Sequence, residues 1–160
     1  SGMTLGVWQT RPKSYGYVKI NSKNIHEPPI INPNYLSDPY DVDVLLKSIR
    51  IGKKFLSTSQ LQPYLNGQAN PSNDIQNDDE LLSWARSEGI TVYHMIGTAK
   101  MGPKSDKMAV VNNELQVRGI DSLRVADASI MPSMPSGNTN APTMMIAEKA
   151  SDMILGKLWN

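Results

Sequence analysis

Residues 123–154, LRVADASIMPSMPSGNTNAPTMMIAEKASDMI, carry three kinds of local signal in one stretch. A short apolar run around Val125 is typical of a β-strand. The Pro-, Ser-, Gly- and Asn-rich segment that follows is typical of a turn. From Asn140 onward the spacing is that of an amphipathic helix, with Pro142 near its first turn. The stretch therefore predicts a strand, a turn and a final helix, whose apolar core face is formed by Ile146, Ala147, Ala150, Met153 and Ile154.

Residues 91–102, TVYHMIGTAKMG, place His94 at the end of another short β-like run and follow it with small residues. Only one other histidine is present, His26, in a polar, proline-rich connector that predicts a surface position. Further β-like runs lie around Val110 and Val117. The strand end is expected to fix the imidazole of His94, while the small residues let the backbone pass close to a neighbouring group.

The first part of the chain also mixes strand and helix signals. Residues 11–20, RPKSYGYVKI, alternate large and polar side chains and predict a half-buried antiparallel strand. Residues 27–41 are rich in proline and predict an extended connector that turns at residues 32–34. Interleaved strands and helices indicate an α+β chain.

Two helices are expected before the His94 stretch. Asp38 is a suitable N-cap, and Pro39 suits the first turn of a long helix. Residues 59–77 are rich in Asn, Gln, Pro and Ser and predict a loop, and residues 78–89 predict a short helix ended by Gly89. The apolar face of the long helix is formed by Val42, Leu45, Leu46, Ile49 and Leu56.

The composition excludes several classes of function. The net charge of +1 gives no basic field for nucleic acid. Without cysteine, and with only two histidines, no disulfide, thiolate nucleophile or histidine-rich metal site is expected. No apolar run approaches the roughly 20 residues that span a bilayer, so no membrane span is expected. Residues 1–3 resemble the remnant of a cleaved tag and take no part in the predicted fold.

Three motifs in order resemble the C-terminal part of the glucose-methanol-choline (GMC) oxidoreductases, which are FAD-dependent alcohol oxidases and dehydrogenases. The first is RPKSYGYVKI with PPIINPNYL, the second is YHMIGTAKMG, and the third is the stretch from residue 123 to 154. The resemblance covers residues 11 to about 58 and 91 to 157.

The resemblance implies a division of the chain. Residues 4–90 would form part of a substrate-binding cap, an antiparallel sheet with helices. Residues 91–160 would form a catalytic segment that completes the FAD-binding domain with its C-terminal strand and helix.

It also implies that FAD is the cofactor and that a second part is needed to hold it. Family members bind the ADP half of FAD with an N-terminal Gly-rich βαβ unit. No pair of the eleven glycines has the spacing that opens this motif. The expectation is a C-terminal portion of a longer enzyme, whose partner is the N-terminal FAD-binding portion and which is inactive alone.

The implied catalytic residues are His94 and Asn138. A neutral imidazole can take the hydroxyl proton of an alcohol as its hydride leaves, so His94 would be the general base. The amide of Asn138 would donate a hydrogen bond to the substrate oxygen. The residues implied to line the cofactor are Tyr93, Asp127, Ala128, Asn138, Thr139 and Asn140. Free N–H groups near Thr139, Asn140 and Thr143 would face the pyrimidine edge of the flavin.

Each of these residues also has a purely structural interpretation. His94 would be a hydrogen-bonded core histidine, Asn138 ordinary turn and capping chemistry, and Asp127 a solvated residue at a strand end. At the level of function, the alternatives are a non-enzymatic binding or assembly module and a fragment that reassembles with a separate N-terminal half. The alcohol, the electron acceptor, the oligomeric state and the compartment stay open.

Overall fold

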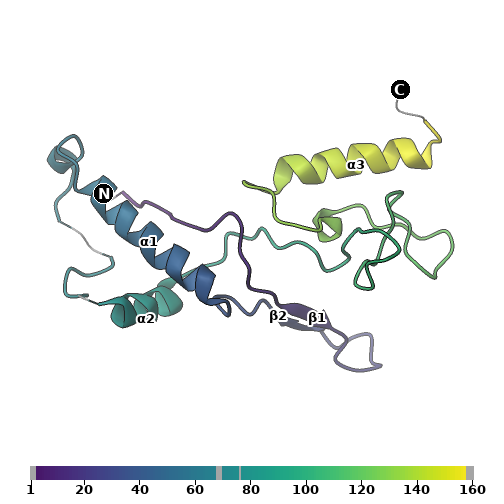
Figure 1. The fold of residues 1–160 in the computed structure, drawn as a ribbon, viewed down its shortest axis with the longest axis horizontal. Helices are drawn as coiled ribbons and strands as arrows, with labels where there is room; N and C mark the ends of the chain where they lie inside the picture. The colour runs from purple at the N-terminus through teal and green to yellow at the C-terminus, as the bar shows by residue number, and fades with distance from the viewer. Residues whose placement is uncertain (1–2, 68–69, 76, 158–160) are drawn as a thin grey trace. The chain divides into compact units, whose positions relative to one another are not determined.

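The computed structural model describes residues 3–67, 70–75 and 77–157 (Figure 1). Residues 1 and 2 of the expected tag remnant therefore lie outside the described residues. Helices combined with a small antiparallel sheet confirm the α+β class. In chain order the elements are β1 (Tyr17–Lys19), β2 (Ile30–Asn32), α1 (Pro39–Leu56), the 3₁₀ helix η1 (Gln62–Tyr64), α2 (Asp78–Glu88), the 3₁₀ helix η2 (Ala128–Ile130) and α3 (Asn140–Ile154).

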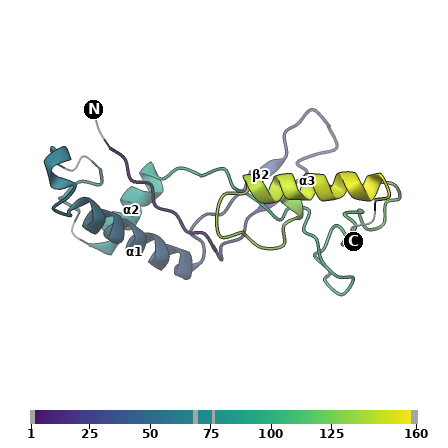
Figure 2. The same ribbon diagram turned by 90° about the horizontal axis from the view of Figure 1, so that it is seen from above.

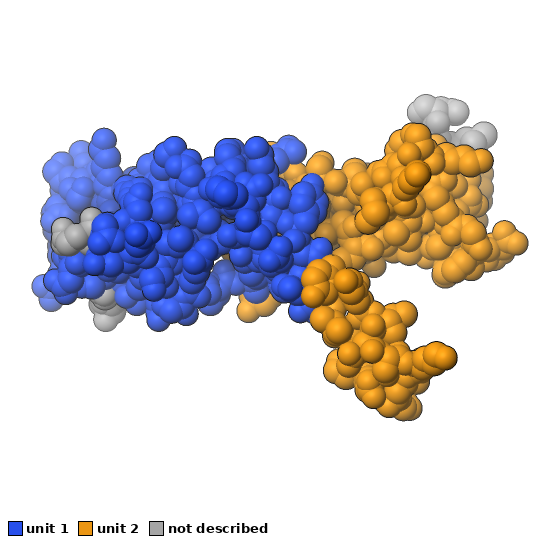
Figure 3. Space-filling model, turned by 60° about the horizontal axis from the view of Figure 1, so that its bottom comes forward, with its two compact units in different colours: residues 1–16, 31–91 blue, residues 17–30, 92–160 orange. Residues whose placement is uncertain are grey.

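The chain divides into two compact units, which Figure 3 shows in different colours. The first consists of residues 1–16 and 31–91, and the second of residues 17–30 and 92–160. Each unit has its own apolar core. The assignment of residues 4–90 to a cap and of residues 91–160 to a catalytic segment stays a prediction.

In the first unit, α1 and α2 lie side by side (Figures 1 and 2). The predicted start of α1 is confirmed, because the Asp38 carboxylate accepts the N–H of Tyr40 at 2.8 Å and Pro39 opens the helix. The predicted α2 is also confirmed, and it ends before Gly89. Leu56 is half-buried at the end of α1. The buried residues between the two helices are Leu46, Ile49, Leu81 and Ala85.

Strands β1 and β2 form a two-stranded sheet. The strand expected within residues 11–20 is not half-buried as predicted, because every residue of both strands is exposed. A two-stranded ribbon has no covering layer to bury one of its faces. The connector expected at residues 27–41 also contains β2, whose three residues fit between flanking prolines.

The second unit is built around α3 and η2, which pack against each other (Figure 1). The C-terminal strand expected near Val125 does not form: in the described residues from 92 to 157, β-pairing is limited to isolated bridges. Turns with positive φ at Leu115, Gly119 and Ser122 interrupt the chain before a strand can extend. The core is formed by Val111, Leu115, Ile130, Met131, Ile146 and Ala150.

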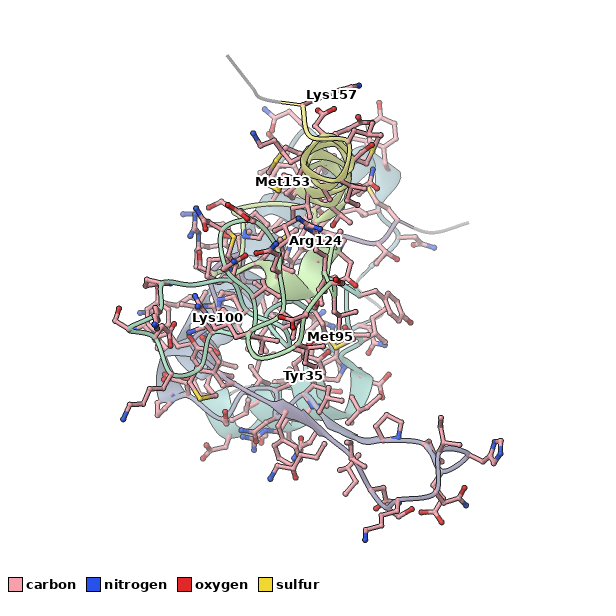
Figure 4. The ribbon with its side chains drawn as sticks, turned by 90° about the vertical axis from the view of Figure 1, so that its right-hand side faces the viewer. Tyr35, Met95, Lys100, Arg124, Met153 and Lys157 are labelled. Atoms are coloured by element: carbon pink, nitrogen blue, oxygen red, sulfur yellow. The ribbon has the colours of Figure 1, made fainter. Side chains whose placement is uncertain are left out.

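The predicted final helix is confirmed as α3, but its buried face is narrower than expected. Ile146 and Ala150 are buried, and Met153, labelled in Figure 4, packs against the same cluster. These positions follow i, i+4, i+7 spacing along one line of the helix. Ala147 and Ile154 are each one residue further on, about 100° around the helix, and both are exposed. Among the described helices, none is long and apolar enough to cross a membrane.

Candidate active site

The segment that carries His94 is attached to η2 by backbone hydrogen bonds. The N–H of Ala99 donates to the carbonyl oxygen of Ser129 at 3.0 Å, and that of Met101 to the carbonyl oxygen of Ile130 at 2.8 Å. Gly97 turns the chain between these bonds and His94 with a φ of 84°, a conformation that glycine adopts without strain. The prediction that His94 lies at the end of a strand is wrong, since residues 91–97 are in no strand. The bonds to η2 position the histidine instead.

The imidazole of His94 is held at one nitrogen. His94 is half-buried, and its Nδ1 lies 3.1 Å from the hydroxyl oxygen of Thr139. Its Nε2 has no hydrogen-bond partner in the part of the chain that the structure describes. The ring is therefore anchored on one side and available for chemistry on the other.

Thr139 is buried at the residue immediately before α3. Its carbonyl oxygen accepts the N–H of Thr143 at 3.0 Å and the hydroxyl of Thr143 at 2.7 Å. The expectation that the N–H of Thr143 is free for a cofactor is therefore wrong, because this N–H is bonded at the start of the helix. Among the described residues, the N–H groups of Asn140 and Ala141 are the ones left without an acceptor there.

The hydroxyl of Thr139 is not used to cap α3. A capping side chain accepts the N–H of the second or third helical residue, usually from a residue in the β region. The third helical residue here is Pro142, which has no N–H, and Thr139 has helical angles of φ −79° and ψ −7°. The hydroxyl is consequently available to His94. Sequence reasoning missed this pairing, although Pro142 was a signal that the usual cap is weakened.

Asn138 is exposed, and its amide forms no hydrogen bond with any described residue. It directly precedes Thr139, so the backbone brings it close to His94. The capping interpretation is not realised, because no side chain caps α3. An exposed amide without a partner, one residue from the contact that holds the imidazole, can donate to a bound polar group.

Asp127 and Ala128 lie at the start of η2, not at a strand end as expected. The Asp127 carboxylate accepts the N–H of Ser129 at 2.8 Å and so caps η2. Asp127 is exposed, whereas Ala128 is half-buried against the core. The packing of α3 on η2 places both residues in the same unit as His94 and Thr139.

Tyr93 and Asn140 present polar groups on the surface of the second unit. Tyr93 is 77% exposed, and its φ is 59°. The left-handed conformation costs a non-glycine residue about 1–2 kcal/mol, so the neighbouring structure must hold Tyr93 in this conformation. Asn140, the first residue of α3, is exposed and its amide contacts the Met144 sulfur at 3.8 Å.

Lys100 lies in the same segment as His94, and its positive charge is paired with a carboxylate. The Nζ of Lys100, labelled in Figure 4, lies 2.7 Å from an oxygen of Asp106. The hydrogen bond from Lys100, together with that from the N–H of Met108, holds the pKa of Asp106 below its usual value. A surface hollow lined by Gly102, Asp106 and Arg118, among others, contains none of the predicted site residues. In the described residues no cluster of His, Asp and Glu could hold a metal ion.

Comparison with known proteins identifies the family. A family model described as GMC oxidoreductase matches residues 12–147. The chain belongs to the GMC oxidoreductase family. Among curated relatives, it is 41% identical over 98% of its length to an alcohol dehydrogenase [acceptor] from Pseudomonas putida. It is 42% identical over 94% of its length to the mitochondrial choline dehydrogenase of Homo sapiens. The chain spans 28% and 26% of the length of these two GMC relatives.

Solved structures agree with the family assignment. The pyridoxine 4-oxidase from Mesorbium loti matches with a TM-score of 0.79 and 28% identity, over 94% of this chain and 29% of that one. An FAD-dependent oxidoreductase from Chaetomium thermophilum matches with a TM-score of 0.81 and 29% identity, over 92% of this chain and 25% of that one. Members of the GMC family are FAD-dependent.

Proposed function

We propose that this chain is the C-terminal portion of an FAD-dependent alcohol oxidoreductase, which transfers a hydride from the CH–OH carbon of a small alcohol to the flavin. The observation that carries the proposal is the imidazole of His94, held at Nδ1 by Thr139 and unpartnered at Nε2 among the described residues. The exposed amide of Asn138 belongs to the residue directly before Thr139 in the chain. Similarity to alcohol and choline dehydrogenases supports an alcohol as the substrate.

In this function His94 is the general base. As the substrate carbon loses its hydride, the hydroxyl proton moves to Nε2 of His94, which has no competing partner in the described chain. Proton transfer to a positioned group of this kind typically contributes about 10²–10⁴-fold to the rate.

Asn138 has the complementary role in the proposal. Its amide N–H donates to the substrate oxygen and stabilises the negative charge that develops there when the O–H bond breaks. The amide does not titrate, so this donor does not depend on pH.

The residues around His94 fit a flavin. The N–H groups of Asn140 and Ala141 and the amide of Asn138 are donors without partners in the described chain, which suits a ring edge that carries acceptor atoms. The exposed ring of Tyr93 suits contact with a flat cofactor. We assign Tyr93, Asp127, Ala128, Asn138, Thr139 and Asn140 to its binding. When bound, the flavin supplies the hydride acceptor.

The remaining parts of the proposal concern the whole enzyme. Residues 4–90 contribute to a cap over the substrate, and an N-terminal FAD-binding portion of the same enzyme holds the ADP half of the cofactor. Within the 160 residues, no glycine spacing supplies that half of the site.

The first test is the size of the native polypeptide in its source cells, measured by immunoblot with an antibody raised against this chain. A band several times larger than 17.7 kDa supports a flavoenzyme of which this chain is one part. A band at 17.7 kDa contradicts that proposal and favours the binding or assembly module.

The second test is flavin reduction by alcohol in the purified native holoenzyme, followed by bleaching of the flavin absorbance. His94→Ala should slow the bleaching by about 10²–10⁴-fold. The matched control is His26→Ala, which removes the exposed histidine of the β1–β2 connection and should leave the rate unchanged. An unaltered rate in His94→Ala removes His94 from the mechanism.

A further inference from the structure

We propose that Thr139 is the positioning residue of His94: its hydroxyl oxygen accepts the Nδ1–H of the imidazole and keeps the proton-accepting lone pair at Nε2. This inference rests on the proposed function of His94 as a base. It assigns to Thr139 a role beyond contact with a cofactor, namely the choice of tautomer in the neutral histidine.

The contact joins two parts of the second unit that are fixed separately. His94 belongs to a segment attached to η2 through Ala99 and Met101. Thr139 belongs to the start of α3, where its carbonyl oxygen accepts two hydrogen bonds from Thr143. Since α3 packs on η2, the 3.1 Å contact between Nδ1 and the hydroxyl oxygen links two supports that already touch.

The hydroxyl oxygen of Thr139 accepts no hydrogen bond from an N–H group of the helix. Thr139 is only 9% exposed, so its oxygen is largely shielded from water. Pro142 removes one of the two N–H groups that a capping oxygen accepts, and no capping bond forms. In the described residues the imidazole of His94 is the one side chain within hydrogen-bond distance of that oxygen.

The direction of this bond decides what His94 can do. A neutral imidazole carries one ring proton, and the nitrogen that lacks it is the base. When Nδ1–H donates to Thr139, Nε2 has the free lone pair and can take the proton of the alcohol hydroxyl. The bond then persists, because both ring nitrogens of the resulting imidazolium are donors. With the opposite direction, the hydroxyl donates to Nδ1, Nε2 carries the hydrogen, and no proton can be accepted there.

The tautomer is measured by NMR of the native holoenzyme labelled with ¹⁵N-histidine, with the His94 signals assigned as those that disappear in His94→Gln. The expected spectrum of neutral His94 has a protonated Nδ1 and an unprotonated Nε2. Thr139→Val keeps the shape of the side chain but removes the acceptor, and should produce a mixture of tautomers. Thr139→Ser restores the hydroxyl and should restore the original spectrum. A protonated Nε2 in the unmodified protein, or a spectrum unchanged by Thr139→Val, overturns the proposal.

Kinetics give an independent readout. Thr139→Val should lower the limiting rate of flavin reduction by about 10- to 100-fold, the range typical for removal of a group that orients a metal-ligating histidine, with little change in KM. Ser151→Ala removes an exposed hydroxyl of the same helix that has no side-chain hydrogen bond among the described residues; it is the matched control and should match the unmodified protein.

The two measurements separate failure of this inference from failure of the proposed function. A tautomer that responds to Thr139→Val while His94→Ala reduces flavin normally supports the positioning role and contradicts the base. Loss of flavin reduction in His94→Ala with an unchanged tautomer in Thr139→Val supports the base and contradicts the positioning role.

Discussion

Asp41 accepts hydrogen bonds from both the backbone N–H and the hydroxyl group of Ser14, across a separation of 27 residues. The N–H of Lys13 donates to the same carboxylate at 2.9 Å. Asp41 is 3% exposed in the first turn of α1, so this carboxylate ties the N-terminal segment to the helix. Burial alone would raise its pKa, but the hydrogen bonds from Ser14 and Lys13 outweigh burial and hold the pKa of Asp41 below its usual value.

Asp41→Asn should lower the free energy of unfolding of the purified protein by about 1–3 kcal/mol at neutral pH, because hydrogen bonds to a buried charged acceptor are lost. The folded pKa of Asp41 lies below its unfolded value, so its contribution is fully present above about pH 4 and is lost as the pH falls through the folded pKa. Urea unfolding at a series of acidic pH values measures this slope, which should be flatter in Asp41→Asn.

The control for Asp41 is Asp43→Asn, two residues along the same helix. Asp43 forms an exposed i,i+4 pair with Lys47 at 2.8 Å. Exposed pairs of this kind contribute about 0.3–0.5 kcal/mol. Equal destabilisation by the two substitutions would contradict a special role for the buried carboxylate.

Ile146→Ala should destabilise the second unit strongly. Ile146 is 7% exposed and belongs to the core cluster with Ala150 and Ile130. Removing a buried isoleucine side chain typically costs about 2–5 kcal/mol, through lost burial and the cavity that remains. Ile154→Ala, in the same helix at a position that is 66% exposed, should change the free energy of unfolding by less than about 0.5 kcal/mol. Urea midpoints of the two variants test the narrow buried face of α3, and similar midpoints would argue against it.

Gly16→Ala should disturb the chain next to β1. A methyl group at Gly16 would lie 2.0 Å from the carbonyl oxygen of Asn32 and 2.6 Å from the carbonyl carbon of Pro33, both of them backbone atoms. Backbone atoms cannot move aside as a side chain can, so we expect a loss of more than about 1 kcal/mol. Gly6→Ala is the control, since the nearest atom there is 3.7 Å away on the ring of Trp8. Thermal unfolding of both variants gives the comparison, and equal melting temperatures would show that the strand end adapts.

The helices could be predicted from the sequence because their signals are local. Asp38 and Pro39 mark the start of α1 within two residues, and Gly89 marks the end of α2. The β-structure could not be predicted in the same way. Bridges such as Met101 with Val111 depend on pairing between separate segments, and a short apolar run does not show whether a partner lies beside it.

The candidate site could likewise be predicted from the sequence only in part. The surroundings of His94 and Asn138 in the sequence pointed to both residues through motifs that resemble the GMC family. The hydrogen bond between His94 and Thr139 could not be predicted, since it joins residues 45 positions apart. Asp127 was expected at a strand end, whereas its carboxylate caps η2, because an Asp followed by a small residue suits the start of a short helix as well.

Asn138→Ala separates a functional amide from a structural one. Because the Asn138 side chain is exposed and makes no hydrogen bond with the described residues, its removal should leave the urea midpoint unchanged. If the amide donates to the substrate oxygen as it gains charge, flavin reduction by alcohol in the native holoenzyme should slow by up to about 10²–10³-fold. Asn138→Asp should be slower still, since a carboxylate cannot donate and repels the developing charge. Asn113→Ala, at an exposed asparagine outside the site, should change neither quantity. A lower urea midpoint with an unchanged rate would return Asn138 to the turn chemistry that its sequence context also allows.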